Sequence, residues 1–320
     1  MQNLHIETPL IESVPLSQRV NGKVWLKVEA LQPTGSFKLR GIGNVCQKYL
    51  LNGAGRFISS SGGNAGIAVA YSGRKLGIPV TVVVPESTTK RAIEAIKQEN
   101  AEVIIKGKTW QDAHNYSATL TDRSSVYIHP FDNPLIWTGH STIIDEVIKL
   151  NLFPDVVILS VGGGGLLCGT IEGLRRNEMI NVPILAVETD GADSLSASIK
   201  AGRHIELEDI KSIATSLGAK KVATAAYDWC HKHEVISHVV SDKDSVDACL
   251  QFSIDHRLLV EPACGASLST LYNPVEVLTD KENILVIVCG GAGVTFAQID
   301  AWKQLLDKNI IDEDGKESVP

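Results

Sequence analysis

The stretch "FISSSGGNAGIAVAY" at residues 57–71 decides how the chain folds. An apolar run of strand character enters it and an apolar run with helical spacing leaves it, and three serines, two glycines and Asn64 lie between them. Small residues leave backbone amides uncovered, and the start of a helix directs its free amides toward whatever precedes it. The stretch therefore predicts a βα unit whose turn belongs to a ligand site.

The same alternation covers most of the chain. Short β-branched runs, each followed by a Gly/Pro/Ser turn and a stretch of helical periodicity, are typical of βα units around a parallel sheet. Strands are expected at residues 24–29, 56–60, 79–85, 101–106, 155–161, 183–188, 234–240 and 283–289. Helices are expected to begin near Ser36, Asn64, Thr89, Thr109, Leu166, Asp193, Asp242, Cys264 and Val294. The predicted fold class is α/β.

Composition narrows the class of protein. The 320 residues are 44% hydrophobic and 21% charged, with a formal net charge of -7, so no basic face for a nucleic acid is expected. We find neither a signal-peptide pattern nor an apolar run long enough to span a membrane, and we expect a cytoplasmic protein. Its six cysteines form no CxxC pair, which favours reduced thiols over disulfides.

The segment "VILSVGGGGLLCGTIEGL" (157–174) places four glycines, Gly162–Gly165, between a strand and a helix. Their amides could converge on a phosphate, although the glycines could also serve only close strand–helix packing. No Walker pattern follows, and the dinucleotide pattern GxGxxG fails because Leu167 or Cys168 takes its last position. Glu188, at the end of a later strand, keeps a nicotinamide-dependent oxidoreductase open as an alternative.

The segment "LQPTGSFKLRG" (31–41) places Lys38 beside Phe37, in the expected first turn of a helix. Desolvation and the positive helix end would lower the pKa of the lysine and favour the free amine that forms a Schiff base. Taken alone, a lysine at a turn is more commonly a solvated surface group.

Taken together, five segments resemble a known family. "PTGSFKLRG", "SSGGNAG", "SVGGGGLLCG", "LVEPACGA" and "VIVCGG" look like the pyridoxal-phosphate enzymes of the tryptophan-synthase-β type, and most closely the L-serine dehydratase/L-threonine deaminase branch. The resemblance runs from residue 7 to about residue 306. It implies two parallel-rich three-layer αβα domains of fold type II, a large cofactor-binding domain at 1–38 plus 138–320 and a small substrate-side domain at 39–137. It also implies a homodimer.

The resemblance implies a role for each matching residue. Lys38 would hold pyridoxal 5'-phosphate as a Schiff base, between the Phe37 ring and residues near Ser216. Asn64 would bind the phenolic oxygen of the cofactor, and Cys289 would face its pyridine nitrogen as a neutral thiol. The phosphate would be bound by Gly162, Gly163, Gly164, Gly165 and Leu166. The carboxylate of an amino-acid substrate would be bound by Ser61, Gly62, Asn64 and Ala65. A monovalent cation, K⁺, would be held by Gly162, Glu188, Ala192, Ser194, Leu217 and Ala219.

The implied reaction is a β-elimination that converts L-serine to pyruvate and ammonia, and L-threonine to 2-oxobutanoate, with Lys38 as general base. An L-threonine-preferring dehydratase, another β-eliminating enzyme of this fold and a cofactor-binding protein without turnover remain alternatives. The chain leaves no room for the regulatory domain of biosynthetic threonine dehydratases, so feedback control by isoleucine is not expected. The segment "WCHKH" (229–233) has no second ligand pair and is expected to be a partly exposed helix face rather than a zinc site.

Gly62 departs from the family pattern. Typical members of the branch have alanine at this position, and racemase-like relatives have a serine that could act as a second base. Because Gly62 has no side chain, racemisation is disfavoured. We also expect looser packing around the substrate. The loss of one methyl group from a packed site costs about 1 kcal/mol, which is enough to alter the preference between L-serine and L-threonine several-fold.

Overall fold

The computed structural model describes residues 2–313, which form two compact units. The first unit comprises residues 2–9, 29–153 and 163–181, and the second comprises 10–28, 154–162 and 182–313. Each unit contains one sheet, so the α/β fold class is confirmed.

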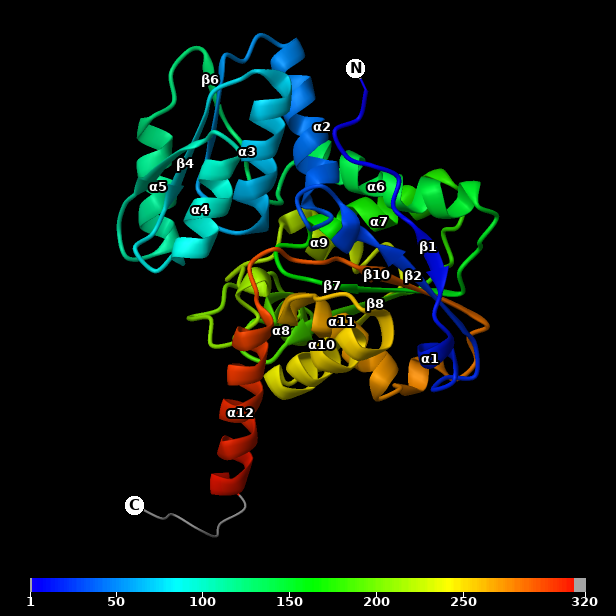
Figure 1. Ribbon diagram of the computed structural model, residues 1–320. Coiled ribbons are helices and arrows are strands. Elements are labelled where there is room, and N and C mark those ends of the chain that lie inside the picture. The colour runs from blue at the N-terminus through cyan, green and yellow to red at the C-terminus, as the bar shows by residue number, and fades with distance from the viewer. Residues whose placement is uncertain (1, 314–320) are drawn as a thin grey trace. The chain divides into compact units, whose positions relative to one another are not determined.

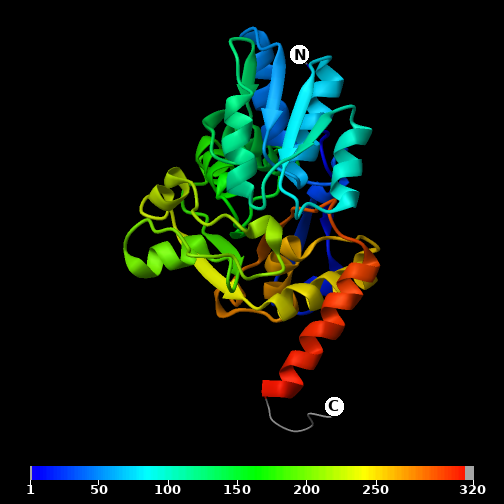
Figure 2. The same ribbon diagram turned by 90° about the vertical axis from the view of Figure 1, so that its left-hand side faces the viewer.

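The first unit is built on a four-stranded, fully parallel sheet of order β5-β4-β3-β6. Helices α3 and α5 both pack on β3 and β4 (Figures 1 and 2). Because β4 and β5 lie on one side of β3 and β6 lies on the other, the strand order reverses at β3, where α/β sheets bind ligands. The strands are β3 (Arg56–Ser59), β4 (Val80–Val84), β5 (Glu102–Ile105) and β6 (Ser125–Tyr127). The helices are η1 (Glu29–Leu31), α2 (Lys38–Leu51), α3 (Asn64–Leu76), α4 (Lys90–Gln98), α5 (Trp110–Thr119), α6 (Pro134–Lys149) and α7 (Gly165–Arg176).

The second unit is built on a six-stranded sheet of order β1-β2-β10-β7-β8-β9, in which only the edge strand β1 is antiparallel. The order reverses between β7 and β10, and α11 packs on both strands (Figure 1). The strands are β1 (Leu10–Glu12), β2 (Lys23–Val28), β7 (Val156–Ser160), β8 (Ile184–Thr189), β9 (Val235–Val240) and β10 (Asn283–Val288). The helices are α1 (Val14–Ser17), α8 (Ser194–Ala201), η2 (Thr215–Leu217), α9 (Thr224–Trp229), α10 (Asp242–His256), α11 (Pro262–Tyr272), η3 (Glu276–Leu278) and α12 (Phe296–Glu313).

The central strands are buried on both faces. Every residue of β4 ("VTVVV"), β7 ("VVILS") and β8 ("ILAVET") is buried, which explains why these strands are continuous apolar runs rather than alternating ones. Glycines in α7 let it approach α6 closely. A Cβ on Gly169 or Gly173 would lie only 2.5–2.8 Å from the nearest atoms of α6.

A buried ionic cluster ties α2 to α6 and to the N-terminal segment within the first unit. The Arg40 guanidinium donates to Glu29 at 2.7 and 2.8 Å and to Glu146 at 2.6 and 2.7 Å, and its side chain is fully buried. The Thr8 hydroxyl donates to Glu29 at 2.6 Å. Both carboxylates therefore share one guanidinium.

All eight expected strands are present, and the expected helix starts agree with the structure to within about two residues. The sequence interpretation missed the short strands β1 and β6 and the helices α1, α6 and α9. Among residues 2–313, no helix has the length and apolar character needed to cross a membrane.

Candidate active site

Lys38 is the first residue of α2, as predicted. Its half-buried amine donates to the Pro130 carbonyl at 3.0 Å and lies 5.1 Å from the centre of the Phe37 ring. A hydrogen bond to a backbone carbonyl holds the amine in place. The amine is therefore positioned for covalent chemistry with a carbonyl compound.

The turn before Lys38 contains buried hydroxyls that lack partners. Thr34 is 4% exposed and Ser36 is 1% exposed, and neither hydroxyl has a hydrogen-bond partner among the described residues. Gly35 between them has a φ of 72°, a conformation that favours glycine. A buried hydroxyl without a hydrogen-bond partner lowers the stability of a folded protein. The two hydroxyls of this turn are therefore suited to bind a polar group of a ligand.

The loop Ser61–Ala65 follows β3, at the point where the strand order reverses. Helix α3 begins at Asn64, and no side chain caps it at Gly63. A Cβ on Gly66 would lie only 1.8 Å from the Ser61 carbonyl oxygen, so glycine at this position lets the loop fold onto the first turn of the helix. The uncapped helix start can receive a carboxylate.

Gly62 does not leave the empty space that the sequence suggested. A Cβ there would lie 2.8 Å from both Cγ2 and Oγ1 of Thr88 and 3.3 Å from Cγ1 of Val84. The Thr88 side chain already occupies the position of the missing methyl group. The space beside Gly62 is therefore filled on this side of the loop, and looser packing around the substrate stays a prediction.

The four glycines after β7 form a tight turn into α7. Gly164 has a φ of 83° and precedes the first residue of α7, Gly165, without a side-chain cap. A Cβ on Gly163 would lie 2.2–2.3 Å from three atoms of the Phe131 ring, and one on Gly165 would lie 2.7 Å from the Phe131 carbonyl oxygen. Leu166, in the first turn, is buried. Bare amides at an uncapped helix start fit a phosphate group.

In the second unit, Gly162 lies where a Cβ would be 3.0 Å from the Ser216 carbonyl oxygen and from Cα of Leu217. Cys289 directly follows β10, on the other strand at which the order reverses. The Cys289 thiol is buried, and a hydrogen bond with the Cys264 thiol together with burial raises its pKa well above the ordinary value. Cys289 is therefore a neutral thiol, as the role assigned to it requires.

The candidate cation residues include a carboxylate that also organises a helix. Glu188, in β8, is fully buried and accepts hydrogen bonds from the backbone amides of Leu195 at 2.9 Å and Ser196 at 2.8 Å. Burial outweighs these two bonds and raises the pKa of Glu188 to about 8. The Ser194 hydroxyl is buried without a partner among the described residues. Ala192 and Leu217 are buried, and the Ala219 amide donates to the Leu217 carbonyl.

Sequence reasoning missed the segment "HPFDNPLIWTGH" (129–140), which provides the partner of Lys38. His129 Nδ1 accepts hydrogen bonds from the amides of Phe131 at 3.2 Å and Asp132 at 2.8 Å. Burial, together with the charges of His114 and Lys38, lowers the pKa of His129 to about 4. His140 is fully buried, its ring centre lies 4.8 Å from that of Phe37, and both ring nitrogens lack hydrogen-bond partners among residues 2–313. The Asn-Pro pair at 133–134 could have indicated the start of α6.

The "WCHKH" segment is not a helix face, because α9 ends at Trp229 and residues 230–233 form a turn. His233 is buried and its Nε2 lies 2.8 Å from the Val182 carbonyl oxygen. Within residues 2–313 we find no group of three or more His, Cys, Asp or Glu side chains suited to a metal ion.

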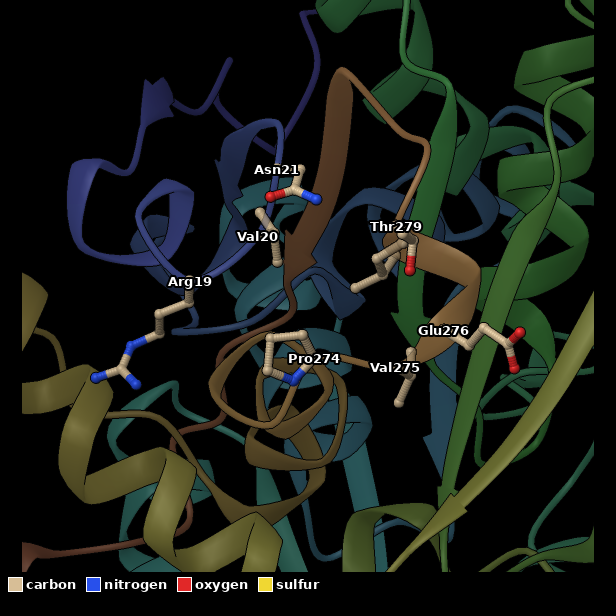
Figure 3. A pocket seen from close by; sticks show the side chains of 8 residues that line it. Arg19, Val20, Asn21, Pro274, Val275, Glu276 and Thr279 are labelled. Atoms are coloured by element: carbon tan, nitrogen blue, oxygen red, sulfur yellow. The ribbon is translucent and has the colours of Figure 1, made fainter.

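A shallow pocket in the second unit is lined by none of these residues. Figure 3 shows Arg19 and Glu276 among its lining side chains, pointing in opposite directions. The pocket lies before the first residues of β2 and β10, whereas Cys289 follows the last residue of β10. Ligands of parallel sheets bind at the carboxyl ends of strands, so this pocket is not the candidate site.

Comparison with known proteins identifies the class. Residues 1–290 match the family model described as "Pyridoxal-phosphate dependent enzyme". The chain is 42% identical over 323 residues to the L-serine dehydratase/L-threonine deaminase of Mus musculus, covering 98% of this chain and 99% of the relative. It is 45% identical over 309 residues to a serine dehydratase-like protein of the same organism, covering 93% and 94%.

Among solved structures, the fungal L-serine ammonia-lyase of Rhizomucor miehei aligns with a TM-score of 0.90 at 36% identity, covering 95% of this chain and 99% of that chain. The chain therefore belongs to the pyridoxal-phosphate-dependent enzymes, with the fold type II architecture that the five sequence segments indicated. The uncapped glycine turn, the unpaired hydroxyls at 34 and 36 and the held amine of Lys38 fit this cofactor.

Proposed function

We propose that the protein is an L-serine dehydratase (L-serine ammonia-lyase), which converts L-serine to pyruvate and ammonia and also converts L-threonine to 2-oxobutanoate. The observation that carries this proposal is the Lys38 amine, half-buried at the start of α2 and held by the Pro130 carbonyl. Relatives with serine dehydratase names over nearly the whole chain support the substrate. An L-threonine-preferring dehydratase is the runner-up.

In this proposal the glycine turn Gly162–Gly165 and Leu166 would hold the cofactor phosphate, and Lys38 would hold the cofactor covalently. Phe37 would pack on the ring, Asn64 would bind its phenolic oxygen and Cys289 would face its nitrogen. When bound, pyridoxal phosphate supplies the electron-withdrawing ring that makes the Cα proton of an amino acid removable.

Residues of the chain orient the substrate and transfer its protons. Ser61, Gly62, Asn64 and Ala65 orient the substrate by its carboxylate at the uncapped start of α3. The Lys38 amine, freed from the cofactor when the substrate binds, would take the Cα proton as general base, and in the net reaction that proton and the departing β-hydroxyl make up the water released. Hydrolysis of the 2-aminoacrylate released gives pyruvate and ammonia. Gly62 carries no side-chain base, which favours elimination over racemisation.

We also propose K⁺ as a ligand of Gly162, Glu188, Ala192, Ser194, Leu217 and Ala219, supported by the buried carboxylate of Glu188 and the unpaired hydroxyl of Ser194. The test compares activity in K⁺ with activity in tetramethylammonium at equal ionic strength. We expect higher activity in K⁺ and loss of this difference in Glu188→Gln. Equal activity in the two salts would contradict the cation site.

We further propose a cytoplasmic homodimer with domains 1–38 plus 138–320 and 39–137. The division is supported by the sheets, because all four strands of the first sheet fall within 39–137 and all six of the second fall outside it. The first unit of the structure also contains α6 and α7, which lie outside 39–137 for most or all of their length.

The decisive experiment compares the wild type with Lys38→Ala and with Lys48→Ala, an exposed lysine on the same helix. The wild type should show the absorbance of lysine-bound pyridoxal phosphate and form pyruvate from L-serine. Lys38→Ala should lose this absorbance and at least about 1,000-fold of its activity, whereas Lys48→Ala should keep both. Borohydride should fix the cofactor to Lys38.

The same preparation separates the alternatives. A colourless protein that oxidises a substrate with a nicotinamide cofactor would establish the oxidoreductase. Cofactor fixed to Lys38 without pyruvate from L-serine or 2-oxobutanoate from L-threonine would establish a binding protein. A higher kcat/KM for L-threonine than for L-serine would establish the runner-up.

A further inference from the structure

Thr88 lies against the loop Ser61–Ala65, where any residue other than glycine at position 62 would place its side chain. Its methyl carbon and hydroxyl oxygen are both 2.8 Å from the ideal Cβ position of Gly62, closer than two residues with full side chains could approach. Gly62 is therefore the residue that lets Thr88 reach the loop. The two positions form a complementary pair within the first unit.

The turn that carries Thr88 is fixed by its own hydrogen bonds. The Thr88 amide donates to the Pro85 carbonyl at 3.0 Å, and the Glu86 amide donates to the Gly107 carbonyl at 2.9 Å. The next residue, Thr89, caps α4 by accepting from the Ala92 amide at 3.2 Å. The location of the Thr88 side chain is thus set by the backbone and not by its own polar contacts.

The Thr88 hydroxyl itself makes no hydrogen bond to any of residues 2–313, and its side chain is only partly exposed. A purely space-filling role at Gly62 would need only methyl groups, which valine supplies with the same shape. A hydroxyl held beside the bare amides of a helix start adds a donor that can rotate toward an anion. Hydrogen bonds to a charged acceptor are stronger than those between neutral groups.

We propose that Thr88 is a substrate-binding residue, whose hydroxyl donates to the amino-acid carboxylate received by the loop Ser61–Ala65. This inference rests on the proposed function, because it assigns the same loop to the carboxylate. It adds a residue from the turn after β4 to a site that the sequence motifs placed only after β3. Gly62 and Thr88 then act together, one providing room and the other the donor.

The first test measures binding of L-alanine, which carries the same carboxylate but no leaving group, by titrating the absorbance of the enzyme-bound cofactor. Thr88→Val should weaken binding about tenfold, with cofactor affinity and melting temperature unchanged. Thr88→Ser keeps the hydroxyl and should stay within about twofold of the wild type. Ser87→Ala, an exposed hydroxyl on the same turn, should have no effect.

The same variants should separate KM from kcat in turnover of L-serine. Thr88→Val should raise KM by a similar factor and leave kcat within about twofold, because the carboxylate contact exists before and during the reaction. A Thr88→Val enzyme that binds L-alanine as the wild type does would overturn the proposal. So would a Thr88→Ser enzyme as impaired as Thr88→Val, or a parallel loss of cofactor.

The second test is a double-mutant cycle between positions 62 and 88. Gly62→Ala adds a methyl group where Thr88 lies, and Thr88→Ser removes one, so the pair conserves volume. The two substitutions should be coupled by about fivefold or more in the affinity for L-alanine. Independent, multiplicative effects would show that Thr88 does not act through this contact.

These tests distinguish failure of the inference from failure of the proposed function. L-alanine binding needs the cofactor and the loop but no turnover, so the Thr88 variants can be compared even if L-serine is not a substrate. A wild type that binds L-alanine and forms no pyruvate would refute the dehydratase. The L-alanine titrations of the Thr88 variants would still test whether Thr88 binds the carboxylate. A wild type that forms pyruvate, with Thr88→Val indistinguishable from it, would refute only the inference.

Discussion

Gly163→Ala tests whether the close contact between the glycine turn and Phe131 is what requires glycine at position 163. An alanine Cβ at this position would lie 2.2 Å from Cγ of Phe131 and 2.3 Å from both Cδ atoms. Ordinary contact begins at 3.4 Å, so the turn and the ring must separate by about 1.2 Å. Phe131 cannot yield easily, because its ring packs on His129 and its carbonyl accepts a bond from the Trp137 indole at 2.9 Å.

The magnitude follows from that displacement. Overpacking of this kind costs about 1–3 kcal/mol, which for a chain of 320 residues lowers the melting temperature by about 1.5–4.5 °C. A shift of about 1 Å in a binding turn can cost about 100-fold in activity. We therefore expect pyridoxal-phosphate affinity and kcat/KM to fall by about that factor while the enzyme remains folded.

The assay is equilibrium titration of apoenzyme with pyridoxal phosphate, alongside thermal unfolding. Gly55→Ala is the matched control, because its Cβ would meet only Ser124 at 3.5 Å on an exposed turn. The control should change neither quantity. If Gly163→Ala bound the cofactor as tightly as the wild type, the close contact with Phe131 would not be what requires glycine here.

Two further predictions concern stability. Arg40→Ala should destabilise the protein by about 3–5 kcal/mol in denaturant unfolding, because it removes the guanidinium that two buried carboxylates share. Arg176→Ala, which breaks the exposed pair with Asp145, should cost less than about 1 kcal/mol, and equal losses would contradict this reasoning. Burial lowers the pKa of His140 well below its unfolded value of 6.5, so the folded state binds fewer protons and loses stability as the pH falls below 6.5. The loss should reach about 2 kcal/mol by pH 5 and be smaller in His140→Gln; the same pH profile in both proteins would assign the effect to other groups.

The features that could be predicted from sequence are local ones. The strands of "PVTVVVP" and "DVVILSV" are continuous apolar runs because both of their faces are buried, and the start of α2 at Lys38 follows a Thr-Gly-Ser turn. The switch points at β3 and β7 depend on strand order, which no single segment encodes. They nevertheless agree with the sequence, because the small-residue turns lie directly after these strands.

The features that could not be predicted depend on contacts between distant segments. Helix α6 was missed because burial spreads over much of its surface, so its apolar residues do not form one narrow stripe. The Arg40 cluster joins residues up to 138 positions apart, and from the sequence alone Arg40 is an ordinary charged helix residue. The contact between Gly62 and Thr88 likewise joins two turns whose sequences suggest only a loop and a helix cap.

The glycines of the candidate site are packed more closely than the sequence alone suggests. The Phe131 ring lies against Gly163, and the Thr88 side chain lies against Gly62. In each case a side chain from elsewhere in the same unit fills the place that the glycine leaves. These turns therefore combine bare amides with close packing, which limits the motion that glycine otherwise permits. A rigid cradle of amides is what binding of a phosphate or carboxylate requires, since donors already in place need no reorganisation when the anion arrives.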